Sequence, residues 1–109
     1  MSPSNPIVVL VTASGEEEAA KIAGELVSRR LAACVNIIPG ARSIYRWEGK
    51  ICDGREALMI VKTTADKFTR LSETVAELHS YSTPEVIAMP VTAGSEKYLG
   101  WVFDSVKSA

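Results

Sequence analysis

The 109-residue chain has one histidine, His79, and two cysteines, Cys34 and Cys52, so few side chains could act as an imidazole base, a thiol nucleophile or a soft metal ligand. A Ser-His or Cys-His device would have to use His79 as its base, and nothing in the sequence singles out a nucleophile for it. The sequence also lacks a phosphate-binding P-loop, a GxSxG elbow, an HExxH motif and clustered Cys-His spacing. These observations predict a protein that is not an enzyme.

His79 is nevertheless the titratable side chain of greatest interest. It ends an apolar helical pattern and precedes the polar segment 80–85. Two interpretations are open. His79 is either a helix C-terminal residue that the helix dipole stabilises or one of several polar groups that converge in a binding site at this end of the sheet.

The elements that must position His79 follow from the hydrophobic periodicity. Apolar and β-branched runs predict strands at residues 7–11, 33–47, 50–63 and 86–91. Apolar residues at helical spacing predict helices after Ser14, within 65–80 and within 95–108. Ser14 and Glu17 have the spacing of a capping box, Arg29 and Arg30 suit the C-terminal end of the first helix, and Thr63 or Thr64 is the expected cap of the second helix.

This order of elements predicts an α+β, ferredoxin-like βαββαβ fold with a further C-terminal helix. Its antiparallel sheet should carry both crossover helices on one face. Residues 1–6 are expected to be a flexible tail, and residues 7–109 a single domain of common size. Pro90 indicates that the last strand lies at a sheet edge or ends there, because proline cannot donate to a β-ladder.

The central hairpin is longer than the helices require. Its two strands could each extend ~45 Å, whereas a helix of about 15 residues covers only ~22 Å. Pro39-Gly40 predicts a bulge in the first of these strands. The overhang would expose an apolar patch and unpaired strand edges, which favour packing against other copies of the chain in a closed ring. The predicted interface residues are Ile44, Tyr45, Trp47 and Ile51.

The hairpin register also separates the two cysteines. If Trp47 faces Lys50, Cys52 faces Tyr45 and lies ~30 Å along the ladder from Cys34, too far for a disulfide. Both are expected to be buried free thiols.

A cleft is expected where the end of the first strand, the end of the second helix and the hairpin of a neighbouring subunit meet. Polar groups that converge in such a cleft form the usual kind of binding site. The candidate ligand-binding residues are Thr12, Trp47, Tyr81 and Glu85, which lie beside His79 in this arrangement.

The charge balance limits the classes of partner. Twelve basic and thirteen acidic residues give a net charge of −1, so no basic field points to nucleic acid or an anionic membrane. No apolar run is long enough to cross a bilayer, and a secretory signal pattern is absent. A cytoplasmic location is therefore expected.

Four segments in order resemble the CutA divalent-cation tolerance family: "RRLAACVNIIPGARSIYRWEGKI", "LMIVKTT", "LHSYSTPEVIAMPV" and "YLGWV". The resemblance covers residues 7 to 106. It implies a ferredoxin-like homotrimer similar to the PII signalling proteins. It also implies a role in tolerance of divalent metals, with copper(II) binding attributed to some bacterial members.

The metal residues of those copper-binding members are only partly present in this chain. They carry a cysteine where this sequence has Val11, and adjacent histidines where it has Leu78-His79. The sequence therefore favours a homotrimeric tolerance or response protein that binds copper(II) weakly through His79. The alternatives are a PII-like sensor with a small ligand in the intersubunit cleft and a trimeric scaffold without a ligand of its own.

Overall fold

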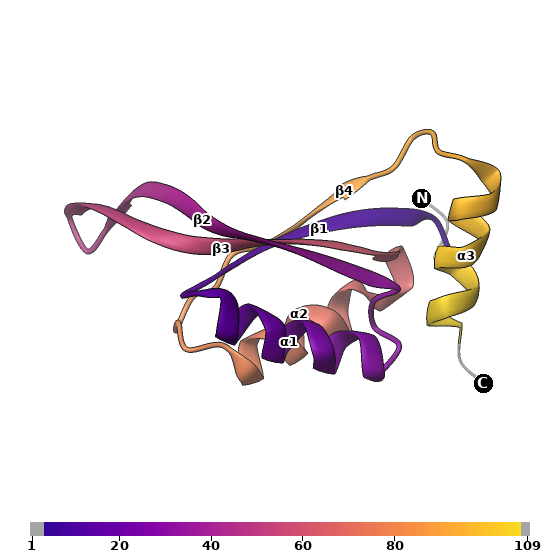
Figure 1. Ribbon diagram of the computed structural model, residues 1–109, viewed down its shortest axis with the longest axis horizontal. Coiled ribbons are helices and arrows are strands. Elements are labelled where there is room, and N and C mark those ends of the chain that lie inside the picture. Colours follow the sequence, from indigo (N-terminus) through magenta and orange to yellow (C-terminus); the bar gives the residue numbers. More distant parts are fainter. Residues whose placement is uncertain (1–3, 108–109) are drawn as a thin grey trace.

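A computed structural model describes residues 4–107 of the chain as one four-stranded sheet with three α-helices (Figure 1). The elements follow in the order β1 (Pro6–Ala13), α1 (Glu16–Ser28), β2 (Cys34–Trp47), β3 (Lys50–Thr64), the short 3-10 helix η1 (Ala65–Lys67), α2 (Phe68–Leu78), β4 (Val86–Pro90) and α3 (Glu96–Val106). All strand pairs are antiparallel, and the strand order is β2-β3-β1-β4. The predicted α+β ferredoxin-like arrangement is confirmed, with β4 at a sheet edge.

The core lies between one face of the sheet and the helices α1 and α2, which Figure 1 shows together below the strands. Alternate residues of β1 are buried on this face, as expected for a strand with side-chain period two. The core residues with no exposed surface include Val9, Val11, Ile22, Leu26, Met59, Val61, Leu71 and Val75. Burial of each large apolar side chain contributes about 1.5–3 kcal/mol, so this layer holds the strand ends and helix ends in fixed positions.

The β2–β3 hairpin extends well past the helices, at the left of Figure 1. The ladder pairs Trp47 with Lys50 and Tyr45 with Cys52, and its register shifts between Ile38 and Ala41, so the predicted register and bulge are confirmed. Glu48 and Gly49 form the turn with φ of 49° and 77°. Both angles are positive, as in the turns that match the twist of a two-residue hairpin.

The outer end of the hairpin is strongly exposed in the single chain. Ile44 and Ile51 are 64% and 70% exposed, and Tyr45 and Trp47 are nearly half exposed. An apolar patch of this kind on one arm is the expected mark of an interaction surface.

Several local predictions differ from the structure. Gly15, and not Ser14, is the N-cap of α1, and no side chain caps this helix. Arg29 is its C-cap and Arg30 follows it, so the last turn contains no basic residue. Thr64 is the N-cap residue of η1, which leads into α2, as expected, but its hydroxyl donates to Asp66 and accepts no capping hydrogen bond.

Two further expectations need correction at the chain start and at the cysteines. Pro6 already belongs to β1, where its carbonyl accepts from the Val91 N–H, so the described fold begins before residue 7. Residues 1–3 of the expected tail lie outside the described residues. Cys34 and Cys52 are free, as predicted, but both are only partly buried, which corrects the expectation of buried thiols.

Candidate functional site

His79 follows the last residue of α2 and turns its ring toward the end of β1. Its backbone N–H donates to the Val75 carbonyl, and the extended backbone at His79 ends the helix. The imidazole is fully buried. The Nε2 atom lies 2.7 Å from the Thr12 carbonyl oxygen, and Nδ1 accepts from the Tyr81 N–H at 3.0 Å. Since a carbonyl can only accept, the proton lies on Nε2 and the ring is neutral.

Glu18 of α1 connects the two loops on either side of this histidine. Its carboxylate accepts from the Ser14 N–H and from the Ser80 N–H, each at 2.9 Å. Burial alone would raise the pKa of Glu18, but these backbone hydrogen bonds outweigh it and lower the pKa to about 2. Glu18 Oε1 also lies 3.8 Å from Nδ1 of His79. The loop after α2 is therefore held by two acceptors, the charged carboxylate of Glu18 and the neutral ring of His79.

Tyr81 is positioned by this arrangement against the hairpin. Its hydroxyl donates to Glu56 Oε2 at 2.8 Å, and its ring lies 4.6 Å from the His79 ring at a tilt of 49°. Burial, followed by the hydrogen bond to Glu56 and the charge of that carboxylate, raises the pKa of Tyr81 to about 12. The phenol thus keeps its proton and remains a donor at neutral pH.

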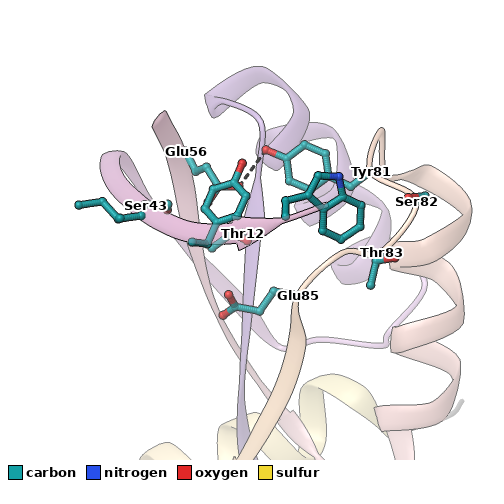
Figure 2. A pocket seen from close by; sticks show the side chains of 10 residues that line it. Thr12, Ser43, Glu56, Tyr81, Ser82, Thr83 and Glu85 are labelled. Carbon is teal, nitrogen blue, oxygen red and sulfur yellow. Dashed lines mark hydrogen bonds between the residues drawn. The ribbon is translucent and has the colours of Figure 1, made fainter. Parts of the chain in front are cut away.

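A pocket of about 630 Å³ opens beside Tyr81, between the hairpin and the loop that leads to β4 (Figure 2). In Figure 2 Ser82 and Thr83 lie on one side of the pocket and Ser43 on the other. Its ten lining residues are Thr12, Ser43, Ile44, Tyr45, Trp47, Glu56, Tyr81, Ser82, Thr83 and Glu85. The volume falls within the range of ~300–1,000 Å³ that small-molecule sites occupy.

The comparison with protein families gives a direct result. A family model described as CutA1 divalent ion tolerance protein matches residues 7–105. The chain belongs to the CutA1 family. Every residue that lines the pocket lies inside the matched range.

Known CutA proteins match over different shares of their length. The divalent-cation tolerance protein CutA of Thermus thermophilus is 50% identical over 95 residues, which cover 87% of this chain and 92% of that protein. Protein CutA, chloroplastic, of Arabidopsis thaliana is 47% identical over 102 residues, which cover 94% of this chain and only 56% of that protein. The crystal structure of CutA1 from Oryza sativa matches with a TM-score of 0.92 at 43% identity, covering 99% of this chain and 100% of the other.

Thr12, Trp47, Tyr81 and Glu85, the ligand-binding candidates of this CutA1 family member, all line the pocket. The hairpin that lines it is the chain's own, whereas the sequence predicted the hairpin of a neighbouring subunit there. His79 does not line it but fixes Tyr81 from behind. Two predicted interface residues, Ile44 and Tyr45, line the pocket as well, whereas Ile51 does not.

Sequence reasoning missed Ser43, Glu56 and the role of Glu18. Glu56 gave one usable signal. It shares the sheet face away from α1 and α2 with Leu58 and Ile60, so it is a charged residue in line with apolar ones. Glu18 gave none, because it looked like an ordinary acidic residue in a first helical turn.

The geometry does not favour His79 as a ready-made metal ligand, because both ring nitrogens already make hydrogen bonds. Within residues 4–107 no three His, Cys, Asp or Glu side chains gather closely enough to hold a metal ion. Within the same range, no helix has the length and apolar character needed to cross a membrane.

Proposed function

We propose that the chain is a non-enzymatic, homotrimeric divalent-cation tolerance or response protein that acts in the cytoplasm. Membership of the CutA1 family over residues 7–105 carries the tolerance role. The absence of the standard catalytic motifs supports a role without chemistry on a substrate.

The trimer is supported by the hairpin end, where Ile44, Tyr45, Trp47 and Ile51 are exposed in the single chain. Contact with a neighbouring subunit would remove this apolar area from water, at ~25 cal/mol per Å². In a closed ring of three subunits, each hairpin end would pack against a neighbour in the same way, and none would be left exposed. Since Ile44, Tyr45 and Trp47 also line the pocket, a neighbour docked on the hairpin would turn the pocket into a cleft between subunits.

Copper(II) is proposed to bind weakly beside His79. Nδ1 would have to release the Tyr81 N–H, and Glu18 Oε1, 3.8 Å away, is the nearest second ligand. That separation could accommodate one ion between the two atoms, given metal–ligand distances of ~2.0–2.2 Å. The affinity for copper(II) should be low, because the site has only two protein ligands and because binding breaks the Tyr81 N–H hydrogen bond. Such binding could also serve as a response to copper(II), because it would release the loop that carries Tyr81.

Native mass spectrometry of chelator-free protein, before and after addition of stoichiometric copper(II), tests this proposal. The expected result is a trimer that gains copper, with less copper retained by His79→Ala and by Glu18→Gln. Glu17→Gln is the matched control, because Glu17 is an exposed residue on the same helix. A monomer would contradict the trimer, and equal copper uptake by all the variants would contradict the metal site.

A second candidate is a sensor resembling PII, with a small ligand in the pocket. The pocket itself favours this candidate, because it brings aromatic rings, hydroxyls and carboxylates together around about 630 Å³. A rise in melting temperature caused by a small molecule without metal would support it.

A further inference from the structure

The pocket beside Tyr81 has a pronounced charge bias. Among residues 4–107 of the single chain, its lining contains two carboxylates, Glu56 and Glu85, and no lysine, arginine or histidine. A phosphate or carboxylate ligand would meet like charge there without a compensating donor cation, which is unfavourable. The lining therefore selects against anions and favours a cationic ligand.

Glu56 is the more deeply placed of the two carboxylates. It is only 9% exposed, and the one hydrogen-bond partner of its carboxylate among residues 4–107 is the Tyr81 hydroxyl, which donates to Oε2. A carboxylate can accept more than one hydrogen bond. Glu56 thus retains acceptor capacity for a ligand N–H at a site where little water reaches.

The pKa of Tyr81, raised to about 12, keeps this phenol a donor, so its hydroxyl and Glu56 act as a fixed pair. A positioned acceptor of this kind costs a ligand less reorganisation than a mobile surface carboxylate does. Glu85 approaches from the start of β4 in Figure 2 and is exposed, so it adds charge at the mouth of the pocket.

The aromatic side chains supply the second half of a cation site. Tyr45 and Trp47 come from the hairpin and Tyr81 from the opposite loop, and all three line the cavity. The face of an aromatic ring attracts an ammonium group, most strongly for tryptophan. The same rings can pack against an apolar body. The hydroxyls of Ser43 and Thr83 are further acceptors for N–H groups.

We propose that this pocket binds an organic ammonium ion, a protonated amine with an apolar or aromatic body. Glu56 and Glu85 supply the counter-charge, and Tyr45, Trp47 and Tyr81 enclose the body. A cavity of about 630 Å³ suits a small organic molecule much better than a single metal ion. This inference rests on the small-ligand role proposed above and specifies its ligand class.

Benzylammonium, benzyl alcohol and benzoate form a matched set of probes, because they share one ring and differ in charge. Titration of the trimeric protein is followed by the indole N–H signals of the two tryptophans. Trp47 lines the pocket, whereas Trp101 lies on α3 outside it and serves as an internal reference. The expected result is a shift of the Trp47 signal alone, with benzylammonium binding at least ~10-fold more tightly than the other two probes.

Substitution of glutamate by glutamine removes the charge of a side chain but keeps its shape, so it tests the role of charge in ligand binding. Glu56→Gln and Glu85→Gln should each weaken benzylammonium binding, by roughly tenfold and severalfold, while Glu17→Gln on the outer surface of α1 should leave it unchanged. Glu85 is exposed, so its variant remains informative if the Glu56 variant folds poorly.

Three outcomes would overturn the inference. Binding of benzyl alcohol or benzoate as tight as that of benzylammonium would refute the charge selection but leave the small-ligand role standing. Unchanged affinity in Glu85→Gln and in a folded Glu56→Gln would refute the assigned counter-charges. The absence of a Trp47 shift with every probe would refute both the pocket and the small-ligand role, while the trimer and copper proposals would depend on mass spectrometry alone.

Discussion

The ring of His79 donates from Nε2 to the carbonyl oxygen of Thr12 over 2.7 Å, which bonds the end of α2 to the penultimate residue of β1. The other ring nitrogen accepts from Tyr81, so one neutral side chain joins a strand, a helix end and the loop beside the pocket. The single histidine of the chain therefore has a structural role, holding these three segments together, that its place in the sequence did not reveal.

The first prediction is that His79→Ala lowers the free energy of unfolding by about 2–4 kcal/mol, because it removes two hydrogen bonds and leaves a cavity. Urea unfolding at fixed protein concentration measures the loss. His79→Asn keeps an acceptor for the Tyr81 N–H, and should recover part of the stability. If His79→Ala is as stable as the parent, the ring does not hold the loop in place.

Glu18 gives a prediction about acid. Its folded pKa of about 2 lies below the ordinary value of 4.5, so its contribution is present above about pH 4.5 and is lost as pH falls toward 2. Glu18→Gln should therefore cost about 1–2 kcal/mol at neutral pH and show a flatter decline of stability between pH 5 and pH 2. Unfolding curves at several pH values test this. Parallel acid declines in the parent and the variant would show that the carboxylate is not held as described.

Tyr81 gives the opposite pH dependence: its contribution to stability is lost at alkaline pH. Its pKa is raised from 10.0 to about 12, so its contribution is complete below about pH 10 and is lost as pH rises toward 12. Tyr81→Phe should cost about 1–2 kcal/mol at pH 8, because Glu56 loses its hydrogen-bond donor. The gap between parent and variant should narrow above pH 10.

Tyr45→Phe is the matched control for that experiment, because the Tyr45 hydroxyl has no hydrogen-bond partner among the described residues. It should change stability little at any pH. A similar loss in both variants would mean that the Tyr81–Glu56 hydrogen bond contributes nothing particular.

The fold could be predicted from the sequence because its signals are local. The apolar run at 7–11, the Pro39-Gly40 bulge and the turn before Lys50 each depend on residues close together in the chain. The hairpin register followed from the turn, and this placed Tyr45 and Trp47 correctly.

The sequence predicted that the end of β1 and the end of α2 meet, but the individual hydrogen bonds that build the site could not be predicted, because they join distant positions. Glu18 meets Ser80 across 62 residues and His79 meets Thr12 across 67. The local rule for helix caps assigned Ser14 a side-chain role, whereas its backbone N–H is satisfied by Glu18. Such choices depend on how the loop after α2 returns to the sheet, which no short sequence pattern specifies.

The exposed hairpin end predicts how self-association can be broken. Ile44→Asp together with Ile51→Asp should raise the dissociation constant of the proposed trimer by at least ~100-fold, since two apolar contacts are replaced by desolvated charge. Sedimentation velocity over a range of concentrations measures this. Val27→Asp, at an exposed apolar position on α1, is the control and should leave the assembly intact. If the double variant remains a trimer, the hairpin end is not the interface.

The turn at the hairpin tip gives the last prediction. Gly49 has φ of 77°, where a Cβ is strained, so Gly49→Ala should lower stability by ~1 kcal/mol. Gly54→Ala, in the same hairpin but without a positive φ or any atom near the added Cβ, should cost much less. Glu48 has φ of 49°, so Glu48→Asn should stabilise the turn, because Asn-Gly suits two consecutive positive φ angles. Thermal unfolding of the three variants tests the order. Equal melting temperatures for the Gly49 and Gly54 variants would show that the turn is not held in the left-handed region, and the register that places Trp47 at the pocket would then need another cause.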